Sequence, residues 1–488
     1  MDAVHYIGGS WVPGRGPELS SEDPASGETL WQGAAADSRD VDAAVRAARR
    51  ASENWAALSL EARVERIERF GQALADQSDA FARVLCRDAG KPLWESRTEI
   101  EAMAGKIGSS IRAIRERRSP RCTQAGTTTL ATRYKPHGVL AVLGPFNLPG
   151  HLPNAHIVPA LLAGNAVVFK PSEKTPLAGE ELARIWERAG LPAGVFNMVQ
   201  GGRATGGLLA AHSGIDGLLF TGSFAAGQAL SRLVAQTPGR MLALEMGGNN
   251  PLAVWAPDDP GAAAYATILS AFITSGQRCS CARRLIVADD AAGDRFLERL
   301  LDMTQSVRVG PWQDDPEPFM GPVITPEAAF DLLAAQDRLL RQGGRPLLPM
   351  RLLRKKGGLL APGILDVTEA RERPDEEIFG PLLQVVRVRD FDALIEEANH
   401  TAYGLTAGLL SERRELYDAF CRRVRAGVLS WNRPTTGPSG SLPFGGVGRS
   451  GNHRPSGYFA ADYCSYPVAS VEVDALEAPV RPVPGIAL

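Results

Sequence analysis

Long apolar runs are missing from this sequence, and so is any marked excess of charge. No stretch approaches the roughly 20 consecutive apolar residues that a membrane-spanning helix needs. The opening residues, MDAVHYIGGSWVPG, lack the basic start and apolar stretch of a secretory signal. A formal net charge of -2 over 488 residues gives no bulk attraction to nucleic acid or to a membrane surface. We therefore expect small molecules, or further copies of this chain, as partners.

Cysteine is also scarce. The chain has six cysteines, and their positions form no disulfide-framework spacing, which favours a reducing cytoplasm as the compartment. Cys281 closely follows Cys279 in SGQRCSCARR, but no histidine or further cysteine lies at the spacing of a zinc site. We expect no bound metal, and we expect most of the cysteines to be small buried side chains.

The sequence does contain a regular alternation of apolar runs and amphipathic segments. Its length exceeds what one hydrophobic core supports, so we expect two or three domains. Residues 40 to 118 are rich in Ala, Arg and Glu with helical spacing, which predicts a helical layer. From 139 to 246, short runs such as GVLAVLG and NAVVFK alternate with helical segments, which indicates βαβ units and a parallel sheet. A second α/β region follows, with its boundary near Gly247 and Gly248.

The segment beyond Trp431 is rich in Gly, Pro and Ser, and it predicts a long loop that lines a site. It contains GVGRSG, with Gly446, Gly448 and Gly451 at the spacing of the dinucleotide fingerprint. We reject that match because no strand precedes it and no βαβ unit contains it.

A better phosphate-binding candidate is GSFAAG, residues 222–227, which follows the apolar run GLLFT and opens a helical segment. Free N–H groups at a helix start favour an anion, although a simple βα turn explains the glycines equally directly. Lys170 and Glu173 follow another predicted strand, at the edge where α/β sheets bind ligands. A carboxylate there would repel a 2′-phosphate and so favour NAD over NADP, but an ordinary helix start also carries such residues.

Cys279 lies at a junction between a helical segment and the apolar run LIVA, where a side chain projects toward a cleft. A nucleophilic cysteine needs a lowered pKa or a nearby base. The bare sequence does not locate that partner, so a structural cysteine is the default interpretation at this point.

An ordered set of motifs favours a nucleophilic over a structural role for Cys279. Together they resemble the aldehyde dehydrogenase superfamily over nearly the whole chain, and the segments are GPFNLPGHLPNAHIVPALLAGNAVVFKPSE, FTGSFAAG, LEMGGNNP, GQRCSCARR, EEIFGPLL and LPFGG. The resemblance implies an enzyme that oxidises an aldehyde to an acid with NAD. By matching motifs, Cys279 would be the nucleophile, Glu245 the general base and Asn147 a donor of the oxyanion hole. The cofactor would contact Lys170, Glu173, Gly222, Ser223, Phe224, Gly227, Glu377 and Phe379.

The resemblance also implies an α/β architecture with two larger domains and an arm. An NAD-binding domain would comprise residues 1–121 and 139–246, and a catalytic domain residues 247–461. A small β arm, residues 122–138 and 462–488, would join subunits into a homodimer or homotetramer.

Several stretches, above all HLPN and GNHRPS, are closer to one branch of the family, whose members oxidise a semialdehyde with two carboxylates in arginine catabolism. Such a substrate calls for cations near the mouth of the pocket, and the candidates are Arg433, His453 and Arg454. Two alternatives remain: another semialdehyde, succinic or glutamic, as the substrate, or a binding or structural protein without activity on the same fold. Intact Cys279, Glu245 and Asn147 argue against the second alternative.

Overall fold

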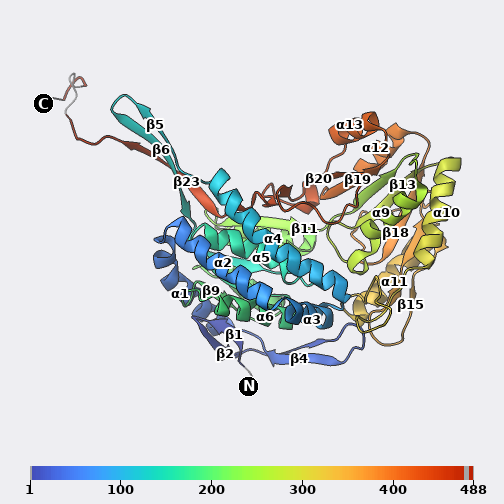
Figure 1. Ribbon diagram of the computed structural model, residues 1–488, viewed down its shortest axis with the longest axis horizontal. Helices are drawn as coiled ribbons and strands as arrows, with labels where there is room; N and C mark the ends of the chain where they lie inside the picture. Colours follow the sequence, from blue (N-terminus) through green and yellow to red (C-terminus); the bar gives the residue numbers. More distant parts are fainter. Residues whose placement is uncertain (1–2, 478–482, 487–488) are drawn as a thin grey trace.

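The computed structural model describes residues 3–477 and 483–486. It contains two layered halves, each built on a seven-stranded sheet, and an arm that extends from the first half (Figure 1). In this described part of the chain, no helix has the length and apolar character needed to cross a membrane.

The sheet of the first half is parallel except at one edge. Its strands lie in the order β11 (Met241–Met246), β10 (Gly217–Gly222), β7 (Val139–Leu143), β8 (Ala166–Lys170), β9 (Phe196–Met198), β1 (Ala3–Ile7) and β2 (Ser10–Pro13). Only β1 and β2 run antiparallel to their neighbours. The predicted parallel sheet between 139 and 246 is therefore confirmed, and residues near the N-terminus extend it.

Helices cover both faces of this sheet, because the central strands are apolar on both sides. Leu140 and Val142 of β7 pack into one core, whereas Val139 and Ala141 pack into another. The first core is covered by α2 (Leu60–Asp76), α3 (Ser78–Ala89), α4 (Leu93–Arg117), α5 (His151–Leu162) and α6 (Pro176–Arg188). The second is covered by α1 (Ser38–Ala56), α7 (Arg203–Ala211) and α8 (Phe224–Val234). The helices predicted between 40 and 118 are confirmed as α1 to α4, but they do not form one layer, because α1 covers the opposite face of the sheet from the other three.

The second half repeats this plan. Its strands lie in the order β14 (Arg345–Leu348), β17 (Gly363–Asp366), β18 (Leu382–Val388), β13 (Ala282–Ala288), β12 (Asn250–Val254), β19 (Thr406–Leu410) and β20 (Val428–Trp431), with β14 alone antiparallel. One face packs on α9 (Pro260–Phe272) and α10 (Ala291–Gln305), and the other on α11 (Pro326–Arg341), α12 (Phe391–Asn399) and α13 (Arg414–Arg423).

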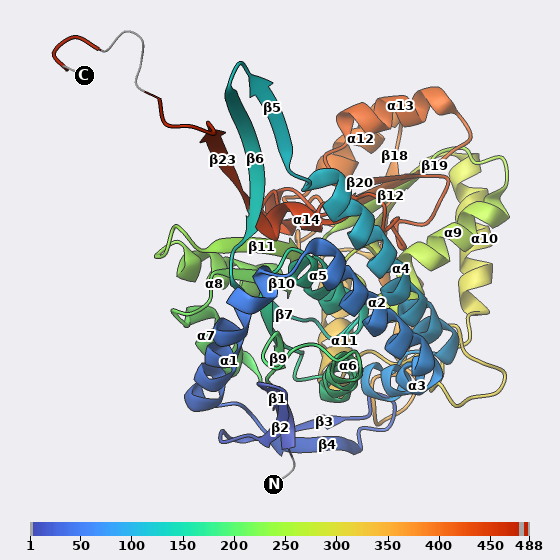
Figure 2. The same cartoon turned by 60° about the vertical axis from the view of Figure 1, so that its left-hand side comes forward.

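The arm is a three-stranded antiparallel sheet in which β6 (Thr128–Pro136) lies between β5 (Arg121–Ala125) and β23 (Ser465–Glu472). Figure 2 shows it projecting away from both halves. The short helix α14 (Ala460–Tyr463) leads into β23. The arm predicted for 462–488 includes residues 478–482 and 487–488, which lie outside the described residues.

Small elements complete the fold. They are the hairpin β3 (Glu18–Glu22) and β4 (Thr29–Ala34), the pair β15 (Arg351–Leu352) and β16 (Leu360–Ala361), the pair β21 (Pro443–Phe444) and β22 (Ser456–Gly457), and the 3-10 turns at Ile273–Gly276 and Gly448–Ser450. The β3–β4 turn reaches the second half, where the Gly358 N–H donates to the Pro24 carbonyl at 2.8 Å. GVGRSG contains only the second 3-10 turn, which confirms that it is no βα fingerprint.

Candidate active site

A cleft of about 1220 Å³ lies between the two halves, at the carboxyl ends of β7, β8, β10 and β11. Open α/β sheets bind ligands at this edge. Nine residues predicted from sequence line the cleft, namely Asn147, Lys170, Glu173, Gly222, Ser223, Glu245, Cys279, Glu377 and Phe379. They come from segments far apart in the chain, and the fold brings them into one site.

Cys279 follows a tight turn that requires a glycine at position 276. Thr274, Ser275 and Gly276 all have positive φ, between 54° and 70°, and a Cβ on Gly276 would collide with the Gly380 carbonyl. The buried Arg283 guanidinium braces this turn by donating to the carbonyl oxygens of Gly276 at 2.5 Å and Arg278 at 2.9 Å. The turn therefore holds Cys279 rigidly, with its thiol facing the cleft.

The backbone on either side of the nucleophile is held by a second residue. The Asn250 amide donates to the carbonyl oxygens of Cys279 at 2.6 Å and Cys281 at 2.9 Å. Asn250 begins β12, shortly after Glu245 in the chain. One segment therefore carries Glu245 and also holds the backbone around Cys279. Cys281 is fully buried and its thiol approaches the Ile273 carbonyl, which is the environment of a structural cysteine.

Glu245 lies near the end of β11 with only 4% of its surface exposed. Neither carboxylate oxygen has a hydrogen bond of good geometry within the part of the chain that the structure describes. Burial raises the pKa of this carboxyl to about 8, the Glu377 carboxyl adds to the effect, and the facing Cys279 thiol and Thr221 hydroxyl oppose it. A carboxyl with that pKa accepts a proton readily near neutral pH.

The Cys279 thiol has a pKa well above its ordinary value, because it is buried and faces the Glu245 carboxylate. Sequence reasoning required either a lowered pKa or a nearby base. Among the described groups that act on this thiol, the structure shows the carboxyls of Glu245 and Glu377 and no cation. The thiolate is therefore not preformed, and the thiol loses its proton as it reacts.

Asn147 lies in the loop between β7 and α5, is 5% exposed, and lines the same cleft. Its neighbour Phe146 meets the ring of Phe379 edge-on at 5.9 Å between centroids. This contact links the loop that carries the amide donor to the loop that carries Glu377 and Phe379.

The carboxylate of Glu377 accepts a hydrogen bond from the Gly248 N–H at 3.1 Å. A Cβ on Gly247 would collide with this carboxylate, so the close approach needs a glycine. Burial raises the pKa of Glu377 to about 7, and the Arg283 guanidinium opposes that shift. Arg283 also lies 5.3 Å from the centre of the Phe379 ring.

At the far end of the cleft, Lys170 is 7% exposed and donates to the carbonyls of Pro171 and Gly201. Its ammonium lies 3.8 Å from the Glu173 carboxylate. Burial lowers the pKa of Lys170 to about 8, against the opposing effect of Glu173. A cation and an acceptor therefore stand together at the end of β8.

Ser223 caps α8, because its hydroxyl accepts from the Ala226 N–H at 3.3 Å. Phe224 and Gly227 are not among the residues that line the cleft. The Phe224 ring instead meets Tyr403 at 6.4 Å, and a Cβ on Gly227 would collide with the Met246 sulfur. Gly227 thus allows α8 to approach β11, while cofactor contact by these two residues stays a prediction.

Arg433, His453 and Arg454 are exposed and do not line the cleft. The segment around the last two nevertheless reaches the catalytic strand. Gly451 forms a bridge with Glu245, and the Asn452 side chain bonds the backbone of Leu242 and Leu244 at 2.9 and 3.0 Å. Substrate binding by the three cations remains a prediction.

Sequence reasoning missed Thr221, His156, Tyr463 and Arg283. A signal existed for two of them, because Arg283, together with Arg284, is charged in a strand whose other residues are apolar, and His156 is polar in a largely apolar helix. Buried polar residues of this kind usually have a specific partner. Their partners lie too far along the chain to be identified without the fold.

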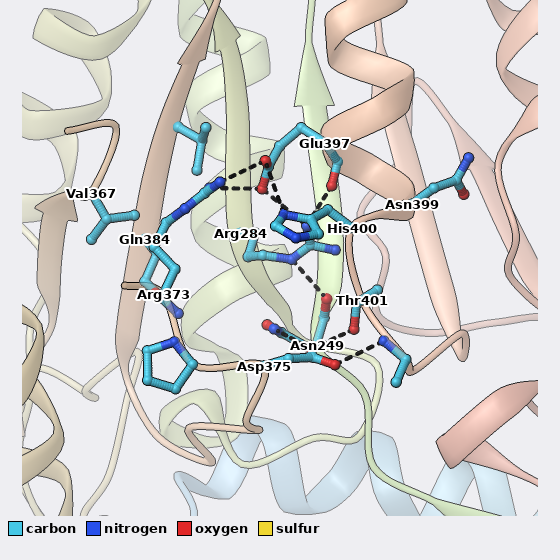
Figure 3. Close-up of a pocket in the computed structure, with 13 residues that line it drawn as sticks. Asn249, Arg284, Val367, Arg373, Asp375, Gln384, Glu397, Asn399, His400 and Thr401 are labelled. Carbon is cyan, nitrogen blue, oxygen red and sulfur yellow. Dashed lines mark hydrogen bonds and ion pairs between the residues drawn. The ribbon is translucent and has the colours of Figure 1, made fainter. Parts of the chain in front are cut away.

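A second cavity, of about 390 Å³, lies on the other side of the loop 247–250 (Figure 3). Arg373 makes a two-pronged pair with the Glu397 carboxylate at 2.8 and 2.9 Å, and Arg284 reaches the same carboxylate at 3.2 Å. Asp375 accepts from Asn249, Thr401 and Ala402 at 2.6 to 3.0 Å. These contacts tie the segment after Glu245 to the segment before Glu377.

Comparison with known proteins supports the same chemistry. Residues 11–467 match the model of the aldehyde dehydrogenase family. The chain is 52% identical over 485 residues to N-succinylglutamate 5-semialdehyde dehydrogenase of Hahella chejuensis and 53% identical over 483 residues to that of Chromobacterium violaceum. Each alignment covers 99% of both proteins. Among solved structures, 1-pyrroline-5-carboxylate dehydrogenase from Thermus with bound NAD superposes with a TM-score of 0.91 and 30% identity, over 96% of this chain and 92% of that one.

Proposed function

The chain belongs to the aldehyde dehydrogenase family, and from that premise we propose that it oxidises N-succinyl-L-glutamate 5-semialdehyde to N-succinyl-L-glutamate with NAD. This reaction would serve arginine degradation by the succinyltransferase pathway. One observation carries the proposal: the thiol of Cys279 faces the buried carboxyl of Glu245 in a cleft between two α/β halves. The full-length similarity to two relatives of that name supports the choice of substrate.

The cleft has room for a dinucleotide at the end where the proposed cofactor-binding residues lie. Gly202 and Gly207 line it, and no atom lies within 4 Å of where their Cβ atoms would be. The start of α8 and Ser223 would hold a pyrophosphate, and Lys170 with Glu173 would hold a ribose. Lys174 and Arg203 line the same end, but the Glu173 carboxylate beside Lys170 favours a ribose with free hydroxyls.

Capture of the aldehyde begins with the Cys279 thiol. Its proton leaves to the water of the open cleft, the sulfur bonds to the carbonyl carbon, and the carbonyl oxygen becomes an oxyanion. The Asn147 amide and the Cys279 backbone N–H would stabilise that charge, and the loss of one such donor costs about 2.7–4 kcal/mol of barrier. Bound nicotinamide supplies the hydride acceptor, and a thioester on Cys279 remains.

Release of the product depends on Glu245. The ionised carboxylate takes a proton from a water molecule that attacks the thioester carbon. The C–S bond then breaks, the proton held by Glu245 passes to the leaving sulfur, and the acid leaves with the Cys279 thiol and the Glu245 carboxylate restored. General-base catalysis of this kind contributes roughly 10²–10⁴-fold.

A substrate panel tests the proposal, with the absorbance of reduced nicotinamide as the readout. We expect N-succinylglutamate 5-semialdehyde to give the highest kcat/KM, ahead of glutamic and succinic semialdehydes and of a neutral aldehyde. A higher value for one of the shorter semialdehydes would assign the enzyme to that substrate instead. In the same panel, Arg433→Ala should raise KM for the dicarboxylate more than for the neutral aldehyde.

We also propose that the arm joins two or four copies of the chain. Leu130, Tyr466 and Val471 on its strands leave large apolar surfaces exposed, between 43% and 75%. Light scattering should show a dimer or tetramer, and Val471→Lys should shift the population toward smaller species.

The domain boundaries that we propose are those expected from the sequence. We also propose a cytoplasmic location, and the absence of disulfides among the described cysteines fits it.

A further inference from the structure

A line of buried polar side chains lies behind the base. His156 of α5 stands at its centre, with Nδ1 2.8 Å from the Tyr463 hydroxyl and Nε2 3.2 Å from the Thr221 hydroxyl. Thr221 of β10 is in register with Glu245 on the neighbouring parallel strand β11. All four residues are buried, with between 3% and 6% of their surface exposed. The line therefore runs from α14, through α5 and β10, to the catalytic carboxyl.

The position of each hydrogen along this line follows from which groups can donate and which can accept. Burial raises the pKa of Tyr463 well above its ordinary value, so its hydroxyl keeps its hydrogen. His156 Nδ1 is the acceptor in reach of that hydroxyl among the described contacts. A buried hydroxyl left without an acceptor is costly, so Tyr463 donates to Nδ1.

His156 is neutral, because burial, assisted by the charge of Lys106, lowers its pKa to about 3. A neutral ring carries a single hydrogen, and Nδ1 already accepts from Tyr463. The hydrogen is therefore on Nε2, which donates to the hydroxyl oxygen of Thr221. The tautomer follows from the identity of the buried partners.

The Thr221 hydroxyl then accepts from His156 and must place its own hydrogen elsewhere. The carboxylate of Glu245 lies beside it, and within the described part of the chain neither of its oxygens has a hydrogen bond of good geometry. The Thr221 hydroxyl is close enough to lower the pKa of this carboxyl, so the carboxylate is the acceptor in reach of the Thr221 hydrogen. Every donor along the line points the same way.

We propose that Tyr463, His156 and Thr221 form a one-directional chain of hydrogen-bond donors that ends on Glu245 and keeps this carboxylate available as the base for thioester hydrolysis. His156 and Tyr463 act as positioning residues, because they touch neither substrate nor cofactor. The proposal rests on the role of Glu245 proposed above.

Other groups around the chain act on the same carboxyl. Cys279 and Glu377 face Glu245 from the other half of the molecule, and Glu377 opposes its ionisation. Lys106 of α4 acts on His156 and donates to the Gly457 carbonyl at 2.8 Å rather than to a carboxylate. The donor chain is thus the main polar support that offsets burial of Glu245 on the β10 side.

The direct test is Tyr463→Phe, which removes only the hydroxyl that starts the chain. Without that donor, His156 is free to accept from Thr221, and Glu245 loses its hydrogen bond. We expect the rate of thioester hydrolysis to fall about tenfold at pH 7, and its acidic limb to move up by about one pH unit. The acyl-enzyme on Cys279 should accumulate, as measured by acid quench and intact-protein mass spectrometry, while the rate of hydride transfer stays unchanged.

Matched variants separate this role from a general loss of packing. Tyr6→Phe makes the same change at another buried tyrosine, in strand β1, and should leave the hydrolysis profile unchanged. Thr221→Ser keeps the final hydroxyl and should resemble the wild type, whereas Thr221→Val should resemble Tyr463→Phe. His156→Gln keeps an amide donor toward Thr221 and should lose less than His156→Leu.

Two results overturn the inference in different ways. If Glu245→Gln slows hydrolysis but Tyr463→Phe and Thr221→Val leave the pH profile in place, the donor chain is wrong and the proposed function stands. If Glu245→Gln itself hydrolyses the thioester at the wild-type rate, the role of Glu245 is wrong. Should Tyr463→Phe fold poorly, Thr221→Val supplies the same decision.

Discussion

The cleft around Cys279 and the cavity around Arg284 lie on opposite sides of one loop, residues 247–250. They differ in whether their buried carboxylates have hydrogen-bond and ion-pair partners. In the cavity, Arg284 and Arg373 share the Glu397 carboxylate, and Asp375 accepts three hydrogen bonds. In the cleft, neither oxygen of Glu245 has a hydrogen bond of good geometry from any residue that the structure describes. Buried groups without partners are costly, so they persist where chemistry needs them. The contrast identifies the cleft as reactive and the cavity as a brace.

The largest effect is expected from Cys279→Ala, which removes the reacting atom from the cleft. Turnover should fall by at least about 10³-fold, since no other described group can form the thioester. Binding of NAD, followed by fluorescence titration, should be retained because the cofactor contacts lie elsewhere. Appreciable remaining oxidation would move the nucleophile to another residue, and Cys281→Ala in the same background would check the first suspect.

The second effect concerns pH. Glu245 acts as a base only when ionised, and burial raises its pKa to about 8. The rate of thioester hydrolysis should therefore rise with pH, and this rise should level off above about 8, whereas a carboxyl with an ordinary pKa would give a flat profile from pH 6 upward. Stopped-flow separation of hydride transfer from steady-state release measures this profile. A flat profile would contradict the raised pKa of Glu245.

Breaking the brace tests the other side of the comparison. Glu397→Gln leaves two arginines, one of them 5% exposed, without their carboxylate. The free energy of unfolding should fall by about 3 kcal/mol, as for other broken buried pairs. Glu65→Gln, which removes an exposed helical pair with Arg69, should change it by less than about 0.5 kcal/mol. Equal losses in urea denaturation would deny the cavity its structural role.

The smallest effect should come from Asp375→Asn, which retains the shape of the side chain but replaces one acceptor oxygen by an NH2 group. Asn249 and Thr401 donate to one oxygen of Asp375 and Ala402 donates to the other, so at least one of the three hydrogen bonds is lost. Burial alone would raise the pKa of Asp375, and the bonds from Asn249, Thr401 and Ala402 overcome this and lower it. The loop carrying Glu377 and Phe379 should then be held less firmly. We expect the Kd for NAD to rise a few-fold, up to about tenfold, with little change in unfolding.

The sequence predicted the layers well, because strands buried on both faces are apolar throughout and helices keep their spacing. The motif set also placed nine of the residues that line the cleft. Pairings across long distances were beyond reach: His156 and Tyr463 are 307 positions apart. Arg283 and Arg284 show a subtler limit. They are neighbours in β13, but alternation along a strand sends one to the nucleophile turn and the other to the cavity.

The cations expected around the substrate illustrate the same limit. Arg433, His453 and Arg454 belong to loops, whose course the sequence does not encode by any period. The structure brings Gly451 and Asn452 onto the catalytic strand while the charged side chains that follow remain exposed. Local composition indicated a loop near the site, but only the fold shows which of its residues touch it.

The most direct test of the account is a single turnover of Glu245→Gln with aldehyde and NAD. Hydride transfer should give close to one reduced nicotinamide per active site, after which the acyl group should remain on Cys279, detectable by peptide mass spectrometry, and decay about 10²–10⁴-fold more slowly than in the wild type. Release of the acid at the wild-type rate, or an acyl group on a residue other than Cys279, would contradict the division of labour between these two residues.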